Sequence, residues 1–210
     1  MVRRNALLSA AALGASAALL AACGNSASQP PAALPVTHAA APSPSPTPSP
    51  SPDASASIPA DLTINFEPPT TTDPKLLAVT ATAKLMVYAY EEALTRGDVH
   101  DPLIHTVVTQ QADLQITELL TQLTGKKTRP SGTVTFFRVT PSQTNGFFGV
   151  AFCEDDSKAV PVTVQGDARQ GNAPSGSSAL RQWGVSFGKD AKGNLVINYL
   201  STQVGGRACT

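Results

Sequence analysis

The stretch DPKLLAVTATAKLMVYAYEEALTRGD, residues 73–98, decides the fold because it carries a complete helix signal at both ends. Asp73 followed by Pro74 is typical of a helix N-terminus, since a carboxylate caps the free amides and proline fits the first turn. Gly97 supplies the left-handed residue that commonly ends a helix. We expect the helix to lie on a sheet because it has two adjoining apolar rows. They are Leu76, Val79, Ala83, Val87, Tyr90 and Leu94, and beside them Leu77, Ala81, Leu85 and Tyr88.

Two shorter helices and a series of strands are expected to follow. Asp101 and Pro102 open a helix that is predicted to reach Val108, and a third helix is predicted over 112–123. We expect four leucines of the third helix to face inward: Leu114, Leu119, Leu120 and Leu123. Helices followed by antiparallel strands predict an α+β fold with a sheet of about five strands, and not a βαβ fold. The β-rich runs are 133–139, 147–153, 159–164, 180–187 and 195–202.

The N-terminus carries an export signal. Two arginines, Arg3 and Arg4, precede an uncharged Ala/Leu-rich stretch that ends at Cys23, which is typical of a cleaved signal peptide. The sequence LAAC at 20–23 resembles the bacterial lipobox, in which the cysteine sulfur receives diacylglycerol. We therefore expect residues 1–22 to be a lipoprotein signal peptide and Cys23 to be lipidated, with the protein on the outer face of the cell membrane. The two arginines also fit a loose twin-arginine signal, so the export route stays open.

A linker is expected between the anchor and the folded domain. The segment APSPSPTPSPSP at 41–52 alternates proline with small residues, and proline removes amide donors and fixes φ, so neither a helix nor a sheet forms. We expect residues 23–72 to be a disordered tether with polyproline II character. The folded domain is expected to span residues 73–210.

Charge and cysteine content narrow the class of protein. The chain has 15 basic and 15 acidic residues, and this balance argues against a nucleic-acid partner, which needs a concentrated basic surface. Three cysteines are present. If Cys23 carries lipid, Cys153 and Cys209 remain as a pair in an oxidising compartment, which predicts a disulfide between them.

Three segments of the domain carry a family resemblance. They are residues 90–98, which close the long helix with Gly-Asp, the segment VAFCEDDS at 150–157, and GRACT at 206–210. With the order of the elements, they resemble the cone-shaped superfamily of nuclear transport factor two and ketosteroid isomerase, and more closely secreted domains in actinobacterial lipoproteins. The resemblance implies helices on a curved sheet, with a polar network at the mouth of the cone. One departure is Leu195, where such domains often carry tryptophan; here Trp183 lies on the preceding strand.

The residues themselves show no catalytic set. Tyr90 and Trp183 are the candidate pocket residues, although Tyr90 continues an apolar row, which favours core packing. Asp155 and Asp156 are interpreted as a solvated turn. The histidines and carboxylates of residues 98–105 are interpreted as caps and turns, and no metal site or cofactor is expected.

These observations lead to one function and two alternatives. We expect a membrane-anchored extracytoplasmic lipoprotein that presents a small binding or interaction domain to an envelope protein or a small apolar ligand, without enzymatic activity. The first alternative is a small-molecule enzyme of the isomerase or cyclase type, and the second is a structural cell-wall spacer. A pocket that holds a buried carboxylate or histidine beside tyrosine would favour the enzyme, and an interior filled by apolar side chains would favour interaction.

Overall fold

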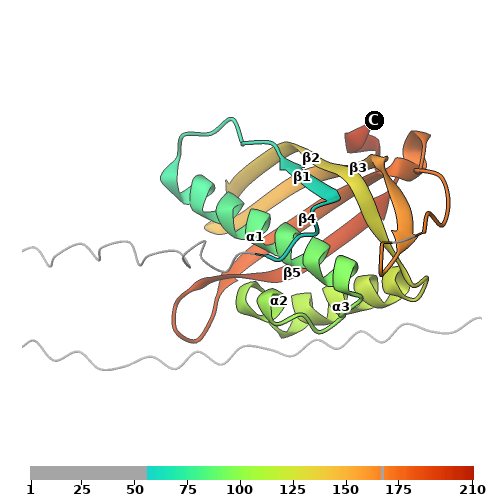
Figure 1. Cartoon of the computed structure of the whole chain (residues 1–210). Helices are drawn as coiled ribbons and strands as arrows, with labels where there is room; N and C mark the ends of the chain where they lie inside the picture. Colours follow the sequence, from blue (N-terminus) through green and yellow to red (C-terminus); the bar gives the residue numbers. More distant parts are fainter. Residues whose placement is uncertain (1–55, 167) are drawn as a thin grey trace, which may run out of the picture. The chain divides into compact units, whose positions relative to one another are not determined.

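The computed structural model describes residues 56–166 and 168–210, and in this part of the chain three α-helices pack on a five-stranded sheet (Figure 1). The α+β fold predicted from the sequence is therefore confirmed. The elements in chain order are β1 (Leu62–Phe66), α1 (Pro74–Arg96), α2 (Pro102–Val107), α3 (Gln110–Thr124), β2 (Thr128–Thr144), β3 (Phe147–Thr163), the 3₁₀ turn η1 (Gly176–Ala179), β4 (Leu180–Lys189), β5 (Leu195–Val204) and the 3₁₀ turn η2 (Arg207–Cys209).

Helix α1 begins and ends at the predicted caps. The Asp73 carboxylate accepts a hydrogen bond from the amide of Lys75 at 2.8 Å, and Gly97 ends the helix with a φ of 67°. The first apolar row is buried from Val79 onward, whereas the second row is not: Leu77 is 43 % exposed, and Ala81 is exposed as well. The helix therefore faces the sheet along one row and the positions beside it, instead of along both predicted rows.

Helix α3 presents a different face from the predicted one. Leu114 is 72 % exposed, while Ala112, Ile116 and Leu120 are fully buried. These three residues recur every four positions and so share one face of the helix, and Leu114 lies two positions away from that face. The expectation that Leu114 points inward was wrong.

The sheet contains a strand that the sequence analysis assigned to the linker. Strand β1 pairs in parallel with β2, from Leu62 opposite Gly132 to Phe66 opposite Phe136, while the other neighbouring strands are antiparallel. Just before β1, Asp61 accepts two hydrogen bonds at 3.0 Å from the buried Arg129 guanidinium. The domain boundary at residue 73 was thus placed too late, because β1 is short and its partner strand lies far along the chain.

Strand β3 is one continuous strand where the sequence predicted two. The polar segment 154–158 has the composition of a turn, yet it stays in the sheet. A β-bulge interrupts the pairing of β2 with β3 here, between Thr133 and Thr135 of β2. It places both Asp156 and Ala159, three residues apart, on the face that carries Glu154. The interpretation of Asp155 and Asp156 as a solvated turn was therefore wrong.

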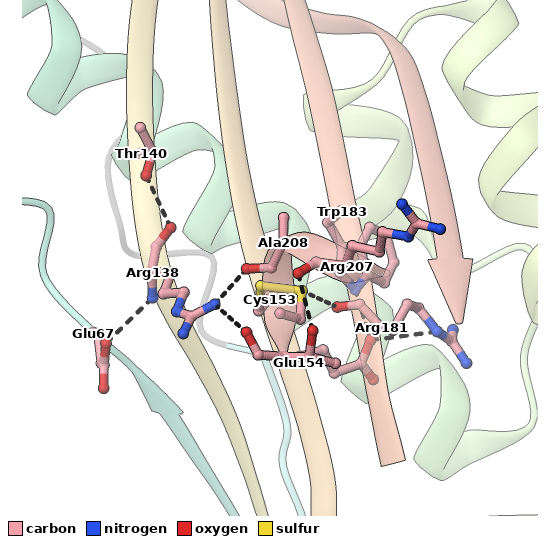
Figure 2. Close-up of a disulfide and its surroundings, with 11 residues drawn as sticks. Glu67, Arg138, Thr140, Cys153, Glu154, Arg181, Trp183, Arg207 and Ala208 are labelled. Atoms are coloured by element: carbon pink, nitrogen blue, oxygen red, sulfur yellow. Dashed lines mark hydrogen bonds and ion pairs between the residues drawn. A yellow bond between two sulfur atoms is a disulfide. The ribbon is translucent and has the colours of Figure 1, made fainter. Parts of the chain in front are cut away.

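A disulfide and an arginine hold the C-terminal segment against the sheet (Figure 2). The disulfide joins Cys153 of β3 to Cys209 of η2, the pair that the sequence predicts, with Cα atoms 5.6 Å apart. Arg138 lies at a second bulge of β2 with a φ of 52°, and its guanidinium donates to the carbonyls of Ala208 and Thr210. The last residues are therefore tied to both β2 and β3.

Removal of the disulfide should destabilise the domain strongly. The bridge closes a loop across a sequence separation of 56 residues. The chain-entropy model assigns a constraint of this length a stabilisation of about 4 kcal/mol. Cys209→Ser should therefore lower the midpoint of thermal unfolding by on the order of 10 °C. Reductant should lower the midpoint of the wild type to the same value and leave that of the Cys153→Ser/Cys209→Ser double variant unchanged. A variant as heat-stable as the oxidised wild type would contradict the prediction.

Candidate functional site

A cavity with a volume of about 490 Å³ lies between the C-terminal half of α1 and strands β2, β3 and β4. Part of its lining is apolar, and this part includes Leu94, Leu123, Ala159 and Pro161. Its rim carries exposed residues, among them Lys126 and Gln170. The buried end of the cavity is polar. We call this end the acid cluster, and it consists of Tyr90, Glu91, Glu154, Asp156 and Arg181.

Three elements position the acid cluster. Tyr90 and Glu91 are neighbours on α1, and each is only 1 % exposed. Glu154 and Asp156 are two residues apart on β3, and their side chains therefore point to the same face of the sheet. Arg181 lies directly opposite Glu154 in the register of β3 with β4. The cluster therefore depends on the pairing of these two strands and on the packing of α1 over them.

Hydrogen bonds connect most of the cluster. Trp183 Nε1 donates to Glu154 Oε2 at 2.6 Å, and Arg181 Nε lies 3.6 Å from the same oxygen (Figure 2). Arg181 also donates from Nη1 to the Tyr90 hydroxyl at 3.1 Å. Within the described part of the chain, Glu91 Oε2 is buried and has no hydrogen-bond partner. Arg181 Nε is also buried without a hydrogen-bond partner, so the cluster holds two polar atoms that these residues leave unsatisfied.

Aromatic rings form the floor beneath these polar groups. Trp183 stacks on Phe152 with ring centroids 5.7 Å apart and an interplanar angle of 12°. The Tyr90 ring meets Trp183 edge-on, with centroids 5.1 Å apart. Such contacts restrict the rings to defined positions. The Trp183 donor and the Tyr90 hydroxyl are therefore held in place before any ligand arrives.

Burial changes the ionisation of the cluster. It raises the pKa of Asp156 to about 8, and the nearby Glu154 charge adds to this effect. Burial also raises the pKa of Glu91 well above its usual range, again with a contribution from Glu154. For Glu154, burial raises the pKa, whereas the Arg181 charge and the Trp183 hydrogen bond lower it. At neutral pH we therefore expect Glu154 to pair as an anion with Arg181, while Glu91 and Asp156 stay protonated.

Of the two candidate pocket residues, Tyr90 lines the cavity and Trp183 lies beneath it, outside the lining. Tyr90 lines the cavity while its ring packs in the core, so the two roles that the sequence analysis set against each other occur together. Trp183 supports the cluster through Glu154. Sequence reasoning missed Glu91, Glu154, Asp156 and Arg181. Two signals were available. Glu91 directly follows Tyr90 of the apolar row, and Glu154 and Asp156 lie two residues apart in a β-rich run. Cys23 lies outside the described residues.

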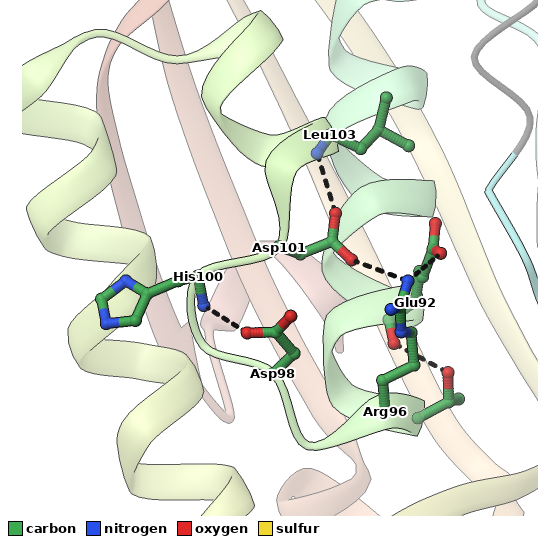
Figure 3. A network of polar contacts seen from close by, with 7 residues as sticks. Glu92, Arg96, Asp98, His100, Asp101 and Leu103 are labelled. Atoms are coloured by element: carbon green, nitrogen blue, oxygen red, sulfur yellow. Dashed lines mark hydrogen bonds and ion pairs between the residues drawn. The ribbon is translucent and has the colours of Figure 1, made fainter.

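The histidines and carboxylates that follow α1 form a separate network of caps (Figure 3). Asp101 accepts from the amide of Leu103 and caps α2, and it lies 3.8 Å from Arg96. Asp98 accepts from the amide of His100 at 3.0 Å, and His105 Nδ1 lies 3.1 Å from a carboxylate oxygen on α3. Among residues 56–166 and 168–210, no three His, Cys, Asp or Glu side chains are grouped to hold a metal ion.

Comparisons with known proteins identify likenesses in structure alone. No protein-family model and no curated protein matches the chain. A solved structure from Catenulispora acidiphila is 11% identical with a TM-score of 0.45, covering 64% of this chain and 96% of that one. Another from that organism, in complex with S-DNPA, is 11% identical with a TM-score of 0.43, covering 62% and 96%. A ketosteroid isomerase-like protein from Erwinia carotovora atroseptica is 14% identical with a TM-score of 0.41, covering 62% and 95%. The chemistry of the cavity therefore has to be derived from this chain's own residues.

The raised pKa of Asp156 should make stability depend on pH. The folded state holds this proton up to about pH 8, whereas the unfolded chain releases it near the ordinary value of 3.8. Between these values the folded state holds more protons at Asp156, so the contribution of this group to the free energy of unfolding should fall as the pH rises, and level off above about pH 8. Asp156→Asn removes this dependence. The variant should exceed the wild type in stability at pH 8 by at least about 1.4 kcal/mol, the equivalent of one pKa unit.

Urea unfolding at a series of pH values measures this difference. Asp155→Asn is the matched control because Asp155 lies next to Asp156 on β3 but outside the cavity lining, where it accepts a hydrogen bond from the Ser157 amide. Its stability should follow the wild type at every pH. A constant difference between Asp156→Asn and the wild type across the range would refute the assigned pKa.

Proposed function

We propose that the domain binds a small molecule in the cavity. The observation that carries this proposal is the convergence of five polar side chains on the buried end of a cavity that is partly apolar, because ligand sites combine an apolar lining with a few placed polar groups. An interior filled with apolar side chains would have favoured a surface for protein interaction. A structural spacer needs neither a cavity nor buried acids.

Acid–base catalysis is a second candidate. Glu91 and Asp156 hold protons at neutral pH beside the Tyr90 hydroxyl, and a carboxylic acid with a raised pKa can donate a proton or a hydrogen bond to a reacting group. The isomerase or cyclase alternative required a buried carboxylate beside tyrosine, and this cavity meets that condition. The resemblance to the cone superfamily agrees with this candidate.

We also propose that the domain works outside the cell membrane on a lipid anchor. The support for this is the lipobox-like sequence LAAC at 20–23, the basic and apolar segments before it, and the proline-rich segment after it. The disulfide between Cys153 and Cys209 suits an oxidising compartment. Within the described residues, no helix has both the length and the apolar character needed to span a membrane.

Fragment screening by NMR tests the small-molecule proposal. A panel of cationic, neutral and anionic fragments should contain members that shift the amide signals of cavity residues such as Ala159 and Arg181. Ala159→Leu extends a side chain into the cavity and should weaken these fragments by about tenfold or more. Ala151→Leu is the matched control because Ala151 is exposed on the same strand. A panel in which no fragment of any charge perturbs the cavity signals would overturn the proposal.

Lipid anchoring is tested by Cys23→Ser. The change removes the thiol that receives the lipid, so the full-length protein should leave the membrane fraction or remain unprocessed. Metabolic labelling with a fatty acid should mark the wild type and not the variant. Cys209→Ser provides the cysteine control, and its labelling should match that of the wild type. Equal labelling of the wild type and Cys23→Ser would contradict the anchor.

A further inference from the structure

The structure of the acid cluster also indicates a ligand class. We propose that the buried end of the cavity receives the ammonium group of a cationic amine, whose apolar body lies along the Leu94 and Leu123 side of the cavity. This inference rests on the small-molecule function proposed above and specifies the charge of the ligand.

The first argument is the balance of charge among the buried groups. Glu91, Glu154 and Asp156 line the cavity, and one guanidinium lies among them, that of the half-buried Arg181. The two other cations of the cavity wall are engaged or distant. Arg129 is held by two hydrogen bonds to Asp61, and Lys126 is exposed at the rim. The buried end therefore has two more carboxyl groups than cationic partners.

The second argument is the balance of donors and acceptors. Arg181 donates to the Tyr90 hydroxyl, and its buried Nε lies 3.6 Å from Glu154 without a hydrogen-bond partner among the described residues. The Trp183 donor is used by Glu154. Glu91 Oε2 is left without a donor although its side chain is almost wholly buried. An unsatisfied buried acceptor is costly, and an ammonium group brings three donors and no acceptor. One such group can bond to the oxygens of Glu91 and Asp156 together.

The third argument concerns the ionisation of the carboxyl groups. A bound cation would offset the effects that keep Asp156 protonated. Burial, together with the charge of Glu154 and its hydrogen bond, keeps Asp156 protonated at neutral pH. A bound ammonium supplies the missing positive charge and favours the ionised acids. Binding should therefore release protons into solution. A neutral ligand that accepts hydrogen bonds would need the acids to keep their protons, and its binding would release none.

This difference fixes the sign of the pH dependence. The pH dependence of the affinity reflects all titratable and charged groups around Asp156. They are Tyr90 and Glu91 from α1, Glu154 and the neighbouring Asp155 from β3, Arg181 from β4, and Arg129 and Lys126 at the edge of the cavity. The buried Tyr90 keeps its proton throughout the range because burial raises its pKa further. Arg181 stays charged because, despite its partial burial, the Tyr90 and Glu154 charges raise its pKa. Affinity for an amine should therefore rise with pH up to about 8 and then level off, until the amine itself loses its proton near about pH 10.

Three compounds with one apolar body and different head groups test the inference: 3-phenylpropylamine, 3-phenylpropan-1-ol and 3-phenylpropanoate. Isothermal titration of the full-length protein should show the amine to bind at least about tenfold more tightly than the alcohol near pH 7.5, and the carboxylate most weakly. Repeating the titration in two buffers of different ionisation enthalpy should show net proton release for the amine and none for the alcohol.

Variants assign the effect to the acid cluster. Asp156→Asn and Glu91→Gln should each reduce the preference for the amine over the alcohol by about tenfold, with little change in the affinity for the alcohol. Asp156→Asn should also flatten the pH dependence. Asp155→Asn should keep the amine preference of the wild type, because Asp155 lies outside the cavity lining and makes the smallest of the contributions to the raised pKa of Asp156. If Glu91→Gln fails to fold, Asp156→Asn carries the same comparison.

The outcomes separate the two proposals. Tighter binding of the alcohol or the carboxylate than of the amine, or proton uptake on amine binding, would overturn the cationic ligand and leave the small-molecule function standing. Equal amine preference in the wild type and in Asp156→Asn would also overturn it. Failure of all three compounds together with the fragment panel would overturn the proposed function as well.

Discussion

The carboxylate of Glu154 is the constraint on which the site depends, because a group that is only 2 % exposed must find its partners where it lies. Two of its partners come from β4: the indole of Trp183 donates a hydrogen bond, and Arg181 supplies the opposite charge. A third, the Asp156 carboxyl, lies two residues along β3 itself. The two partners from β4 meet Glu154 only in the register that places it opposite Arg181. A slip of one residue would turn Glu154 to the other face of the sheet and leave Arg181 without its anion.

The same register organises both faces of β3. On the inner face, Phe152 lies opposite Trp183, and their stacked rings continue through Phe136 and Phe66 into the core below α1. On the outer face, Cys153 is free to meet Cys209. The disulfide and the buried acids therefore lie on neighbouring residues of one strand. The covalent bond that holds the chain end also restrains the strand that carries Glu154.

The signals that could be predicted from the sequence are local. Short stretches of sequence were enough to predict the caps of α1, its apolar row and the hairpin order of the later strands. The α+β class follows from these features. The cysteine pair was found by counting. Strand β1 was missed because its partner lies about 70 residues away in a parallel pairing, which no turn announces.

The polar end of the site was missed for a related reason. Segment 154–158 looks like a turn in composition, and the bulge that aligns Asp156 with Ala159 arises only against β2. Arg181 is the second residue of β4, and nothing in the sequence around it indicates that it will pair with an acid on the adjacent strand β3. These residues would have been found by placing β3 and β4 side by side in the correct register. The sequence alone does not give that register.

The acid cluster lowers stability at neutral pH, and this bears on why it is present. Two buried carboxyl groups and the half-buried Asp156, with the half-buried Arg181 guanidinium among them, are an unfavourable arrangement for folding. Well-packed apolar residues would serve the fold at least as well. Glu91 sharpens the argument, since one of its oxygens has no partner within the described residues although Arg181 lies in the same cluster. A cluster that served packing alone would be expected to satisfy its own members. We propose instead that groups that are held in place, protonated by burial and left partly unpaired at the end of a cavity are arranged for a partner that comes from outside the chain.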